Sequence, residues 1–427
     1  MVWNRVGIRL SLRAPQAYNK NFGHLRLYSR FRHLLNDSRK TNQSVEAFTG
    51  RPLRIAQVAT LYESVPPSGY GGTERVVSYL TEELVKRGHQ VTLFASGDSG
   101  TAAKLIPGWN QALRRARLAS MTNVGIAIHY RLLSMVYERA SEFDVIHAHV
   151  DYWSFPFAHL VATPSITTMH GRLDIEELHP IYRHYPAMPM VSVSDSQRKP
   201  LPDMNWVGTV YHGLPSRLLR FNPEPGKYLA FLGRISPEKG TDLAIDVALK
   251  AGVPIKIAAK VDDVDREYFN KVIEPKLGSA GVEYIGEIDD SQKSEFLGNA
   301  LATIFPIDWP EPFGLVMIES MGCGTPVIAR PIASVPEVLR EGVTGLTAMD
   351  LDGLVAAVKQ VSSISRHRCR EEFETRFTVE SMAVKYETIY RNELANAKAG
   401  GAVNRSMRPS PNGATSNGVV KNGTARK

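Results

Sequence analysis

A regular alternation of short apolar runs with helical stretches is the feature that most limits how this 427-residue chain can fold. The runs in the first half are Arg54–Ala59, Gln90–Ala95, Phe143–His147, Ser165–Met169 and Met190–Ser194, and those in the second half are Tyr228–Leu232, Ile255–Ala259, Val282–Ile285, Ala302–Phe305 and Pro326–Ala329. Strands that are apolar throughout are typical of parallel sheets that helices cover on both faces. The two series therefore predict an α/β protein with two doubly wound domains.

The breaks in this pattern suggest the domain limits. Three prolines and two glycines interrupt it at Gly213–Lys227, so we expect a first domain at 51–220 and a second at 221–378. Apolar residues at helical spacing then predict a closing helix at 379–398. Residues 399–427, which are rich in Gly, Ser and Asn, are typical of a disordered tail.

The positive charge of the chain is concentrated at its ends. Residues 1–50 hold nine Lys and Arg against two acids, and 397–427 hold six against none, so the rest of the chain is acidic although the net charge is +8. A nucleic-acid-binding core is therefore disfavoured. The basic stretch 1–50 suits a transit peptide, a surface-binding arm or a poorly ordered extension.

Two further absences exclude classes of protein. No stretch approaches the ~20 apolar residues of a membrane helix, so a transporter or channel is excluded. Two cysteines, Cys323 and Cys369, are too few for a disulfide scaffold or a four-cysteine zinc site. We expect a cytoplasmic protein, whose basic ends would suit peripheral contact with the inner face of a membrane.

A glycine-rich loop, Gly69-Tyr70-Gly71-Gly72-Thr73-Glu74, follows the first strand and opens a helix. Glycines let a bound group approach the backbone, and a helix N-terminus attracts anions. A tight strand–helix turn explains the same residues. Glu74 stands where a dinucleotide fingerprint has its third glycine, which disfavours a Rossmann dehydrogenase.

Two cations lie just after the first strand of the second half, in Gly233-Arg234-Ile235-Ser236-Pro237-Glu238-Lys239-Gly240. Ligands bind at the carboxyl ends of the strands in open α/β sheets. Arg234 and Lys239 would suit a diphosphate there, since Arg offers a planar fork and Lys a compact charge. Two exposed loop cations remain an equal alternative at this point.

Two glutamates flank the start of a predicted helix at Gly314–Met321. Glu311 precedes the helix and Glu319 lies over a turn inside it. A carboxylate suits a ribose diol, and the free N–H groups of the first helical turn suit an anion. The alternatives are an acid favoured by the helix dipole and a solvent-facing helical acid.

Histidines end several predicted strands. His170, before Gly171, is placed to enter a cleft between the domains, although a lone histidine is more often structural. His147, His149 and His212 have the same ambiguity.

Other motifs of catalysis are weak or missing. The pairs Asp263/Asp265 and Asp350/Asp352 fit a minimal metal pattern, but each begins a predicted helix, where the dipole favours acids. We expect no metal and no cofactor apart from a co-substrate. There is no nucleophile elbow and no P-loop, which disfavours hydrolases and NTPases of those types.

Four motifs together carry a resemblance. GYGGTERVV, MHG, LGRISPEKG and EPFGLVMIESMGCGTPVIA occur in this order. As a set they resemble retaining glycosyltransferases of family 4, which have the GT-B fold. The likeness runs from about Arg54 to Ala397. It implies two Rossmann-like domains facing a cleft, with the nucleotide-sugar donor held mainly by the second domain and the acceptor by the first.

The resemblance also implies roles for the residues in these motifs. Glu319 would bind the donor ribose, and Glu311 and His170 would lie beside the transferred sugar. Arg234 and Lys239 would hold the diphosphate, which the Gly71–Gly72 loop approaches from the other domain. The backbone near the sugar and phosphates would be that of Phe313, Gly314, Leu315 and Val316.

The expected reaction is transfer of a sugar from a nucleoside-diphosphate sugar, with UDP favoured over GDP, to a hydroxyl group of a glycan, lipid or small molecule. The resemblance implies front-face attack with retention of configuration. An NDP-sugar epimerase, a glycan phosphorylase and an inactive nucleotide-sugar-binding scaffold remain alternatives.

Overall fold

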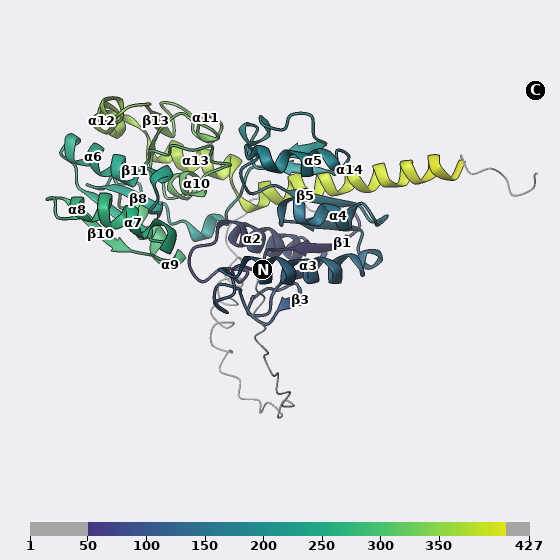
Figure 1. Cartoon of the computed structure of the whole chain (residues 1–427). Coiled ribbons are helices and arrows are strands. Elements are labelled where there is room, and N and C mark those ends of the chain that lie inside the picture. Colours follow the sequence, from purple (N-terminus) through teal and green to yellow (C-terminus); the bar gives the residue numbers. More distant parts are fainter. Residues whose placement is uncertain (1–49, 407–427) are drawn as a thin grey trace, which may run out of the picture. The chain divides into compact units, whose positions relative to one another are not determined.

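The computed structural model describes residues 50–406, with side chains for 50–399, and these residues form two parallel sheets with their helices (Figure 1). The predicted extension at 1–50 therefore lies outside the described residues except for Gly50. The predicted tail lies outside them from residue 407 onward.

The first sheet has seven strands in the order β3-β2-β1-β4-β5-β6-β7, and every neighbouring pair is parallel. Its strands are β1 (Arg54–Val58), β2 (Gln90–Ser96), β3 (Lys104–Trp109), β4 (Val145–Ala148), β5 (Ser165–Thr168), β6 (Met190–Ser192) and β7 (Trp206–Thr209). The helices of this domain are α2 (Gly72–Lys86), α3 (Thr122–Tyr137), α4 (Phe155–Ala158) and α5 (His179–His184). The order reverses at β1, which makes the domain doubly wound as predicted.

The second sheet has six parallel strands in the order β10-β9-β8-β11-β12-β13. They are β8 (Leu229–Arg234), β9 (Ile255–Lys260), β10 (Val282–Gly286), β11 (Ala302–Phe305), β12 (Val327–Ala329) and β13 (Gly345–Thr347). The helices are α6 (Thr241–Ala251), α7 (Arg266–Tyr268), α8 (Glu274–Leu277), α9 (Asp290–Gly298), α10 (Leu315–Gly322), α11 (Val335–Val338), α12 (Leu351–Gln360) and α13 (Arg366–Arg376).

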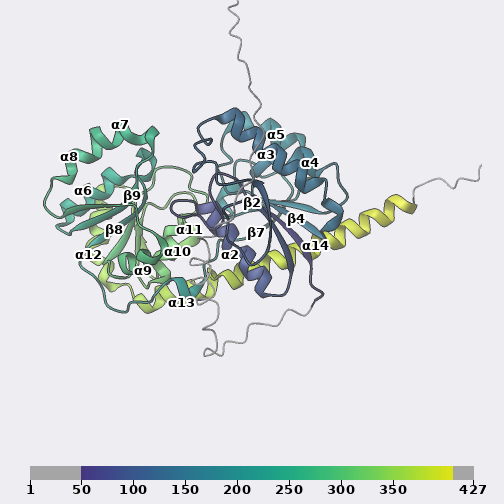
Figure 2. The same ribbon diagram turned by 90° about the horizontal axis from the view of Figure 1, so that it is seen from below.

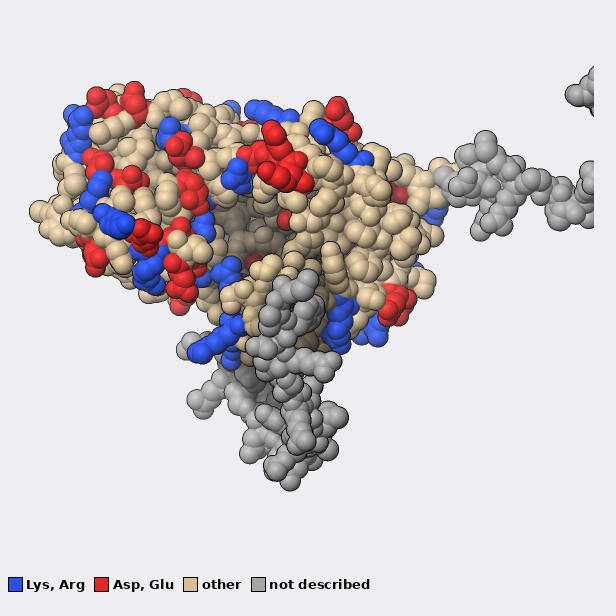
Figure 3. Space-filling model, in the orientation of Figure 1, with Lys and Arg blue, Asp and Glu red and all other residues tan. Residues whose placement is uncertain are grey.

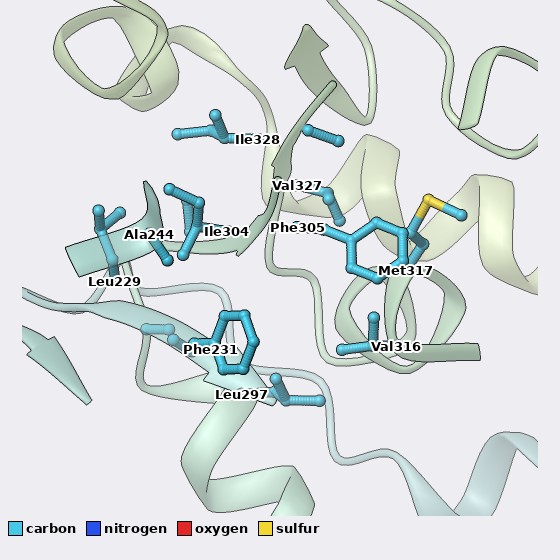
Figure 4. Packing of buried hydrophobic residues seen from close by; sticks show 14 of the residues in the cluster. Leu229, Phe231, Ala244, Leu297, Ile304, Phe305, Val316, Met317, Val327 and Ile328 are labelled. Carbon is cyan, nitrogen blue, oxygen red and sulfur yellow. The ribbon is translucent and has the colours of Figure 1, made fainter. Parts of the chain in front are cut away.

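The core of the second domain fixes α10 against this sheet. Met317 and Val316 of α10 pack with Phe305 at the end of β11, and Phe231 of β8 belongs to the same cluster (Figure 4). Burying side chains of this size contributes roughly 1.5–3 kcal/mol each. The loop that precedes α10 is therefore held on a rigid base.

Three strands escape prediction because their sequences are unlike those of buried strands. The edge strand β3 contains Pro107 and Gly108, and proline is tolerated mainly at sheet edges. Strand β7 contains Gly208 and is only half-buried, and β13 has three residues.

The helix α14 (Val379–Ser406) follows the second domain in sequence but packs on the first (Figures 1 and 2). Its Tyr386 and Tyr390 are buried in the cluster that contains Ile55 of β1 and Val145 of β4. The helix runs past its predicted end at 398, so residues 399–406, which were predicted to belong to a disordered tail, are helical.

None of the helices in the described part of the chain combines the length and the apolar character needed to cross a membrane.

Candidate active site

A cleft of about 650 Å³ opens at the carboxyl ends of the central strands and is lined by both domains (Figure 3). All the predicted site residues line this one cleft. They are Gly71, Gly72, His170, Arg234, Lys239, Glu311, Phe313, Gly314, Leu315, Val316 and Glu319. The structure thus brings together residues that lie up to 248 positions apart in sequence, and their individual roles stay predictions.

The glycine loop leaves space beside the start of α10. A Cβ atom on Gly72 would lie 3.6 Å from Leu315 Cδ1, an ordinary contact distance, so packing alone does not require glycine there. Gly71 is different, because a Cβ atom would lie 2.8 Å from Pro67. The bare backbone at Gly72 therefore allows a ligand to approach between the two domains.

Arg234 ends β8 among three carboxylates. Its guanidinium lies 2.5 Å from Glu238, 3.6 Å from Asp265 and 3.7 Å from Asp262, and the buried Nε atom has no partner among the described residues. A diphosphate would have to compete with these acids for Arg234. Its planar fork could still donate hydrogen bonds to two phosphate oxygens, because Glu238 accepts a hydrogen bond from only one nitrogen of the guanidinium.

Lys239 reaches the cleft because the turn that carries it is tightly folded. The turn Pro237–Lys239 ends at Gly240, whose φ is +68° and whose Cβ atom would lie 2.5 Å from the carbonyl oxygen of Pro306. Only glycine fits there. Lys239 Nζ pairs with Glu311 and lies 4.5 Å above the ring of Trp309.

Both predicted glutamates are held by a neighbouring cation. Glu311 Oε2 accepts a hydrogen bond from Trp309 Nε1 at 2.7 Å in addition to the Lys239 contact. Glu319 Oε1 accepts one from Lys293 Nζ at 2.6 Å, and its side chain is only 8% exposed. Neither is a simple solvent-facing acid, so the alternative interpretation for Glu319 is wrong.

Lys293 and Trp309 were missed by sequence reasoning. Lys293 lies mid-helix in α9 and nothing in its neighbourhood marks it, because only the fold brings α9 beside α10. Trp309 stands in the Pro- and Trp-containing loop before Glu311, where a large aromatic residue near charged groups was a usable signal.

The N-terminus of α10 faces the cleft without a side-chain cap. Gly314 precedes the helix with a φ of +84°, and a Cβ atom there would lie 2.8 Å from Met317 Cε. No side chain caps this end, and Leu315 and Val316 of the first turn line the cleft. Their backbone N–H groups are the kind that bind phosphate oxygens.

His170 lies in the cleft wall at the end of β5. Its Nε2 atom is 2.9 Å from Nδ1 of His149, its backbone N–H donates to Asp151 at 3.2 Å, and its ring stacks on His212. Burial lowers the pKa of His170 to about 3, so the ring is neutral at pH 7. Of the other ambiguous histidines, His212 lines the cleft and His147 is fully buried beneath it.

The acidic pairs lie at or near the starts of helical segments. Among residues 50–406 no group of three or more His, Cys, Asp or Glu residues could hold a metal ion. Asp350 caps α12 by accepting a hydrogen bond from the N–H of Gly353 at 2.8 Å. Asp263 begins a short 3₁₀ turn, and Asp265 ends it directly before α7. These positions agree with the helix-start interpretation.

Comparison with known families decides what kind of protein this is. Residues 70–199 match the model of Glycosyltransferase Family 4, and residues 220–375 match that of Glycosyl transferases group 1. The chain is a GT-B glycosyltransferase of the family 4 type. The predicted family, fold and enzyme class are thus confirmed.

Named relatives of this glycosyltransferase match most of its length. The phosphatidyl-myo-inositol mannosyltransferase of Mycolicibacterium smegmatis is 28% identical over 72% of this chain and 84% of the relative. A glycogen synthase of Mycobacterium tuberculosis is 23% identical over 80% of this chain and 96% of the relative.

Solved structures share the fold. A glycosyltransferase involved in avilamycin A biosynthesis gives a TM-score of 0.61 at 22% identity, covering 81% of this chain and 98% of that one. The HepE protein of Anabaena, solved with UDP and glucose, gives 0.63 at 17% identity, covering 80% of this chain and 100% of that one.

Proposed function

We propose that this glycosyltransferase moves a sugar from a nucleoside-diphosphate sugar, with UDP preferred, to a hydroxyl group of an acceptor, with retention of configuration and without a metal ion. One observation carries the proposal: Arg234, Lys239 and the uncapped start of α10 line the same cleft as Glu319. These are two cations, a set of N–H donors and a buried carboxylate, and a nucleoside diphosphate needs each of them.

The donor would displace contacts that now exist within the protein. Its diphosphate would replace Glu238 at Arg234 and would lie beside Lys239 and the first turn of α10. Its ribose diol would donate to Glu319, which Lys293 holds in place from the other side. The exchange replaces one charge-assisted bond of Arg234 by another, so the added bonds from the α10 N–H groups and to Glu319 would favour it.

The cleft supplies what the transition state needs. As the bond between C1 of the sugar and the phosphate oxygen breaks, negative charge grows on the diphosphate, and Arg234, Lys239 and the α10 N–H groups stabilise it. The metal-free proposal rests on these groups, because they supply the positive charge at the leaving group.

Retention would follow from attack on the face that the diphosphate leaves. The acceptor oxygen forms the new bond to C1, and its proton passes to an oxygen of the departing phosphate. Glu311 is poorly suited to be a nucleophile, since Lys239 and Trp309 both bind its Oε2 atom. It is better suited to orient a hydroxyl group of the sugar.

A donor screen tests the proposal. Purified protein is incubated with UDP-, GDP- and ADP-sugars, with or without an acceptor panel of inositol lipids, α-glucans and sugar phosphates, and release of nucleoside diphosphate is measured. We expect release that depends on the acceptor, with a product of retained configuration by NMR. Sugar epimerisation without acceptor, a requirement for free phosphate, or binding without turnover would each overturn it.

The acceptor panel reflects the relatives, which include enzymes named for a phosphatidylinositol and for glycogen. We also propose peripheral contact with anionic membranes through the basic ends of the chain, where residues 1–50 and 397–427 together hold fifteen Lys and Arg against two acids. Sedimentation with vesicles containing phosphatidylserine, compared with neutral vesicles, tests this. Equal binding to both would contradict it.

A further inference from the structure

A chain of hydrogen bonds links His170 in the cleft to α14 through the interior of the first domain. His170 Nε2 lies 2.9 Å from His149 Nδ1, and His149 Nε2 lies 2.8 Å from Gln57 Oε1. Gln57 Nε2 lies 3.2 Å from the hydroxyl oxygen of Tyr390, which lies 2.8 Å from Nδ1 of His147. Gln57, His147 and Tyr390 are 0% exposed and His149 is 2% exposed. These groups therefore form hydrogen bonds with one another rather than with bulk water.

The direction of these bonds follows from Tyr390. A phenol is a stronger donor than a neutral imidazole N–H, and a bare imidazole nitrogen is a stronger acceptor than a phenol oxygen. Tyr390 therefore donates to His147, and its oxygen accepts from the amide N–H of Gln57. This leaves the amide oxygen of Gln57 facing Nε2 of His149.

The proton of His149 is then assigned. Because an amide oxygen only accepts, His149 Nε2 must carry the proton, and His149 Nδ1 is a bare acceptor. His170 donates to that acceptor from Nε2. The neutral ring of His170 has only one proton, so its Nδ1 atom is bare as well.

The surroundings of His170 hold the ring neutral and in place. Burial lowers the pKa of His149 well below its usual range, with a further effect from His147, and burial lowers that of His170 to about 3. His212 stacks on the His170 ring at 5.3 Å with an angle of 16° between the planes, and Asp151 accepts the backbone N–H. The Nδ1 atom of His170 has no hydrogen-bond partner among residues 50–399, and His170 lines the cleft.

We propose that Gln57 and His149 are positioning residues that hold His170 in the tautomer with a proton on Nε2, so that its bare Nδ1 accepts a hydrogen bond from a hydroxyl group of the transferred sugar. The inference rests on the proposed function, since that function places the sugar beside His170. In the other tautomer His170 would present an N–H group, and the sugar hydroxyl would have to accept instead of donate.

Nitrogen NMR of the full chain tests the tautomer without any substrate. The protein is labelled with ¹⁵N-histidine, and the His170 signals are identified by their loss in a His170→Asn variant. We expect a bare Nδ1 and a protonated Nε2 at pH 7 in the parent protein. His149→Asn should preserve this state, because the asparagine amide can also accept from His170, whereas His149→Phe should not. A proton on Nδ1 of the parent protein would overturn the proposal.

Kinetics with the donor and acceptor found in the screen test whether Gln57 and His149 act on the reaction through His170. We expect Gln57→Leu to lower kcat about tenfold, the lower end of the loss seen when the residue that orients a metal-binding histidine is replaced, with little change in the KM for acceptor. His149→Phe should lower kcat, and His149→Asn should retain a kcat close to that of the parent protein. In the His149→Phe background Gln57→Leu should have no further effect, because Gln57 acts through the polar side chain at position 149, which phenylalanine lacks.

A matched control separates the positioning of His170 from a general loss of protein stability. Thr167 lies on β5 and is 0% exposed, and among the described residues its hydroxyl bonds only that of Ser154, at 3.0 Å. Thr167→Val therefore removes a buried hydrogen bond that does not involve His149. We expect its kcat to stay within twofold of the parent value. An equal loss from Gln57→Leu in both backgrounds would contradict the proposal. Because the NMR result needs no turnover, failure of the tautomer assignment is distinguishable from failure of the proposed function.

Discussion

Replacing Lys239 by alanine tests the electrostatic role of the cleft most sharply. The Lys239 side chain is 15% exposed and its ammonium group is wedged between Glu311 and the face of Trp309. Two unit charges about 4 Å apart interact by about 4 kcal/mol at an effective dielectric constant of about 20. Part of this is offset because Lys239 must loosen its contact with Glu311 to meet the diphosphate.

The expected loss is therefore about 2.7–4 kcal/mol of transition-state stabilisation, or a fall in kcat/KM of roughly 10²–10³. Removal of the cation also leaves the Glu311 carboxylate, 13% exposed, with Trp309 as its remaining hydrogen-bond donor, which adds repulsion toward the diphosphate. Steady-state kinetics with the donor varied, together with calorimetric binding of the nucleoside diphosphate, measure both effects.

Lys250 offers a matched control. It also forms an ion pair, with Asp352, but both side chains are exposed and neither lines the cleft. Lys250→Ala should leave kcat/KM within twofold because Lys250 lies outside the cleft, and should change the free energy of unfolding by only about 0–1 kcal/mol because its ion pair is exposed. If Lys239→Ala folds normally by thermal unfolding and still turns over within threefold of the parent, the assignment of the diphosphate site is refuted.

Three more perturbations have defined outcomes. Glu311→Ala should lower kcat/KM by roughly 10²–10³, and near-normal turnover in a kinetic assay would contradict its place beside the sugar. Treatment with a chelator should leave transfer activity intact in the same assay, and loss that magnesium restores would point back to the acidic pairs. Glu387→Gln should lower the free energy of unfolding by about 2–4 kcal/mol in urea titrations, because Arg87 and His89 both bind this buried carboxylate. Burial alone would raise the pKa of Glu387, but hydrogen bonds from His89 and Arg87 outweigh it and lower the pKa to about 2. The stabilisation is thus present at neutral pH and lost as the pH falls from about 4.3 through about 2, so the variant and parent should converge in acid. A constant difference down to pH 2 would contradict this.

The loops that carry most of the site residues could be predicted from the local sequence. The loops around Gly72, Arg234 and Glu311 each follow a buried strand, and strand ends of parallel sheets converge on one edge. The shape of each loop is determined by residues close to it in sequence. At Gly240 and Gly314, for example, the backbone has a positive φ that favours glycine. The meeting of these three loops at one cleft could therefore be predicted from the sequence.

Other features depend on contacts between distant segments. Lys293 gains its role only because α9 lies beside Glu319, and the edge strands β3 and β7 form only because the rest of the sheet offers them a partner. Gln57 was visible as a polar residue in the middle of an apolar strand, but its partners come from β4, the loop after it and α14. A polar residue in a buried strand signals a network without revealing its other members.

The most direct test of the central claim is a crystal structure of the protein with the nucleoside diphosphate released in the donor screen. The account predicts phosphate oxygens within hydrogen-bond distance of Arg234, Lys239 and the N–H groups of Leu315 and Val316, with the ribose hydroxyls on Glu319. A diphosphate bound elsewhere, with Arg234 still paired to Glu238 and Lys239 to Glu311, would contradict it.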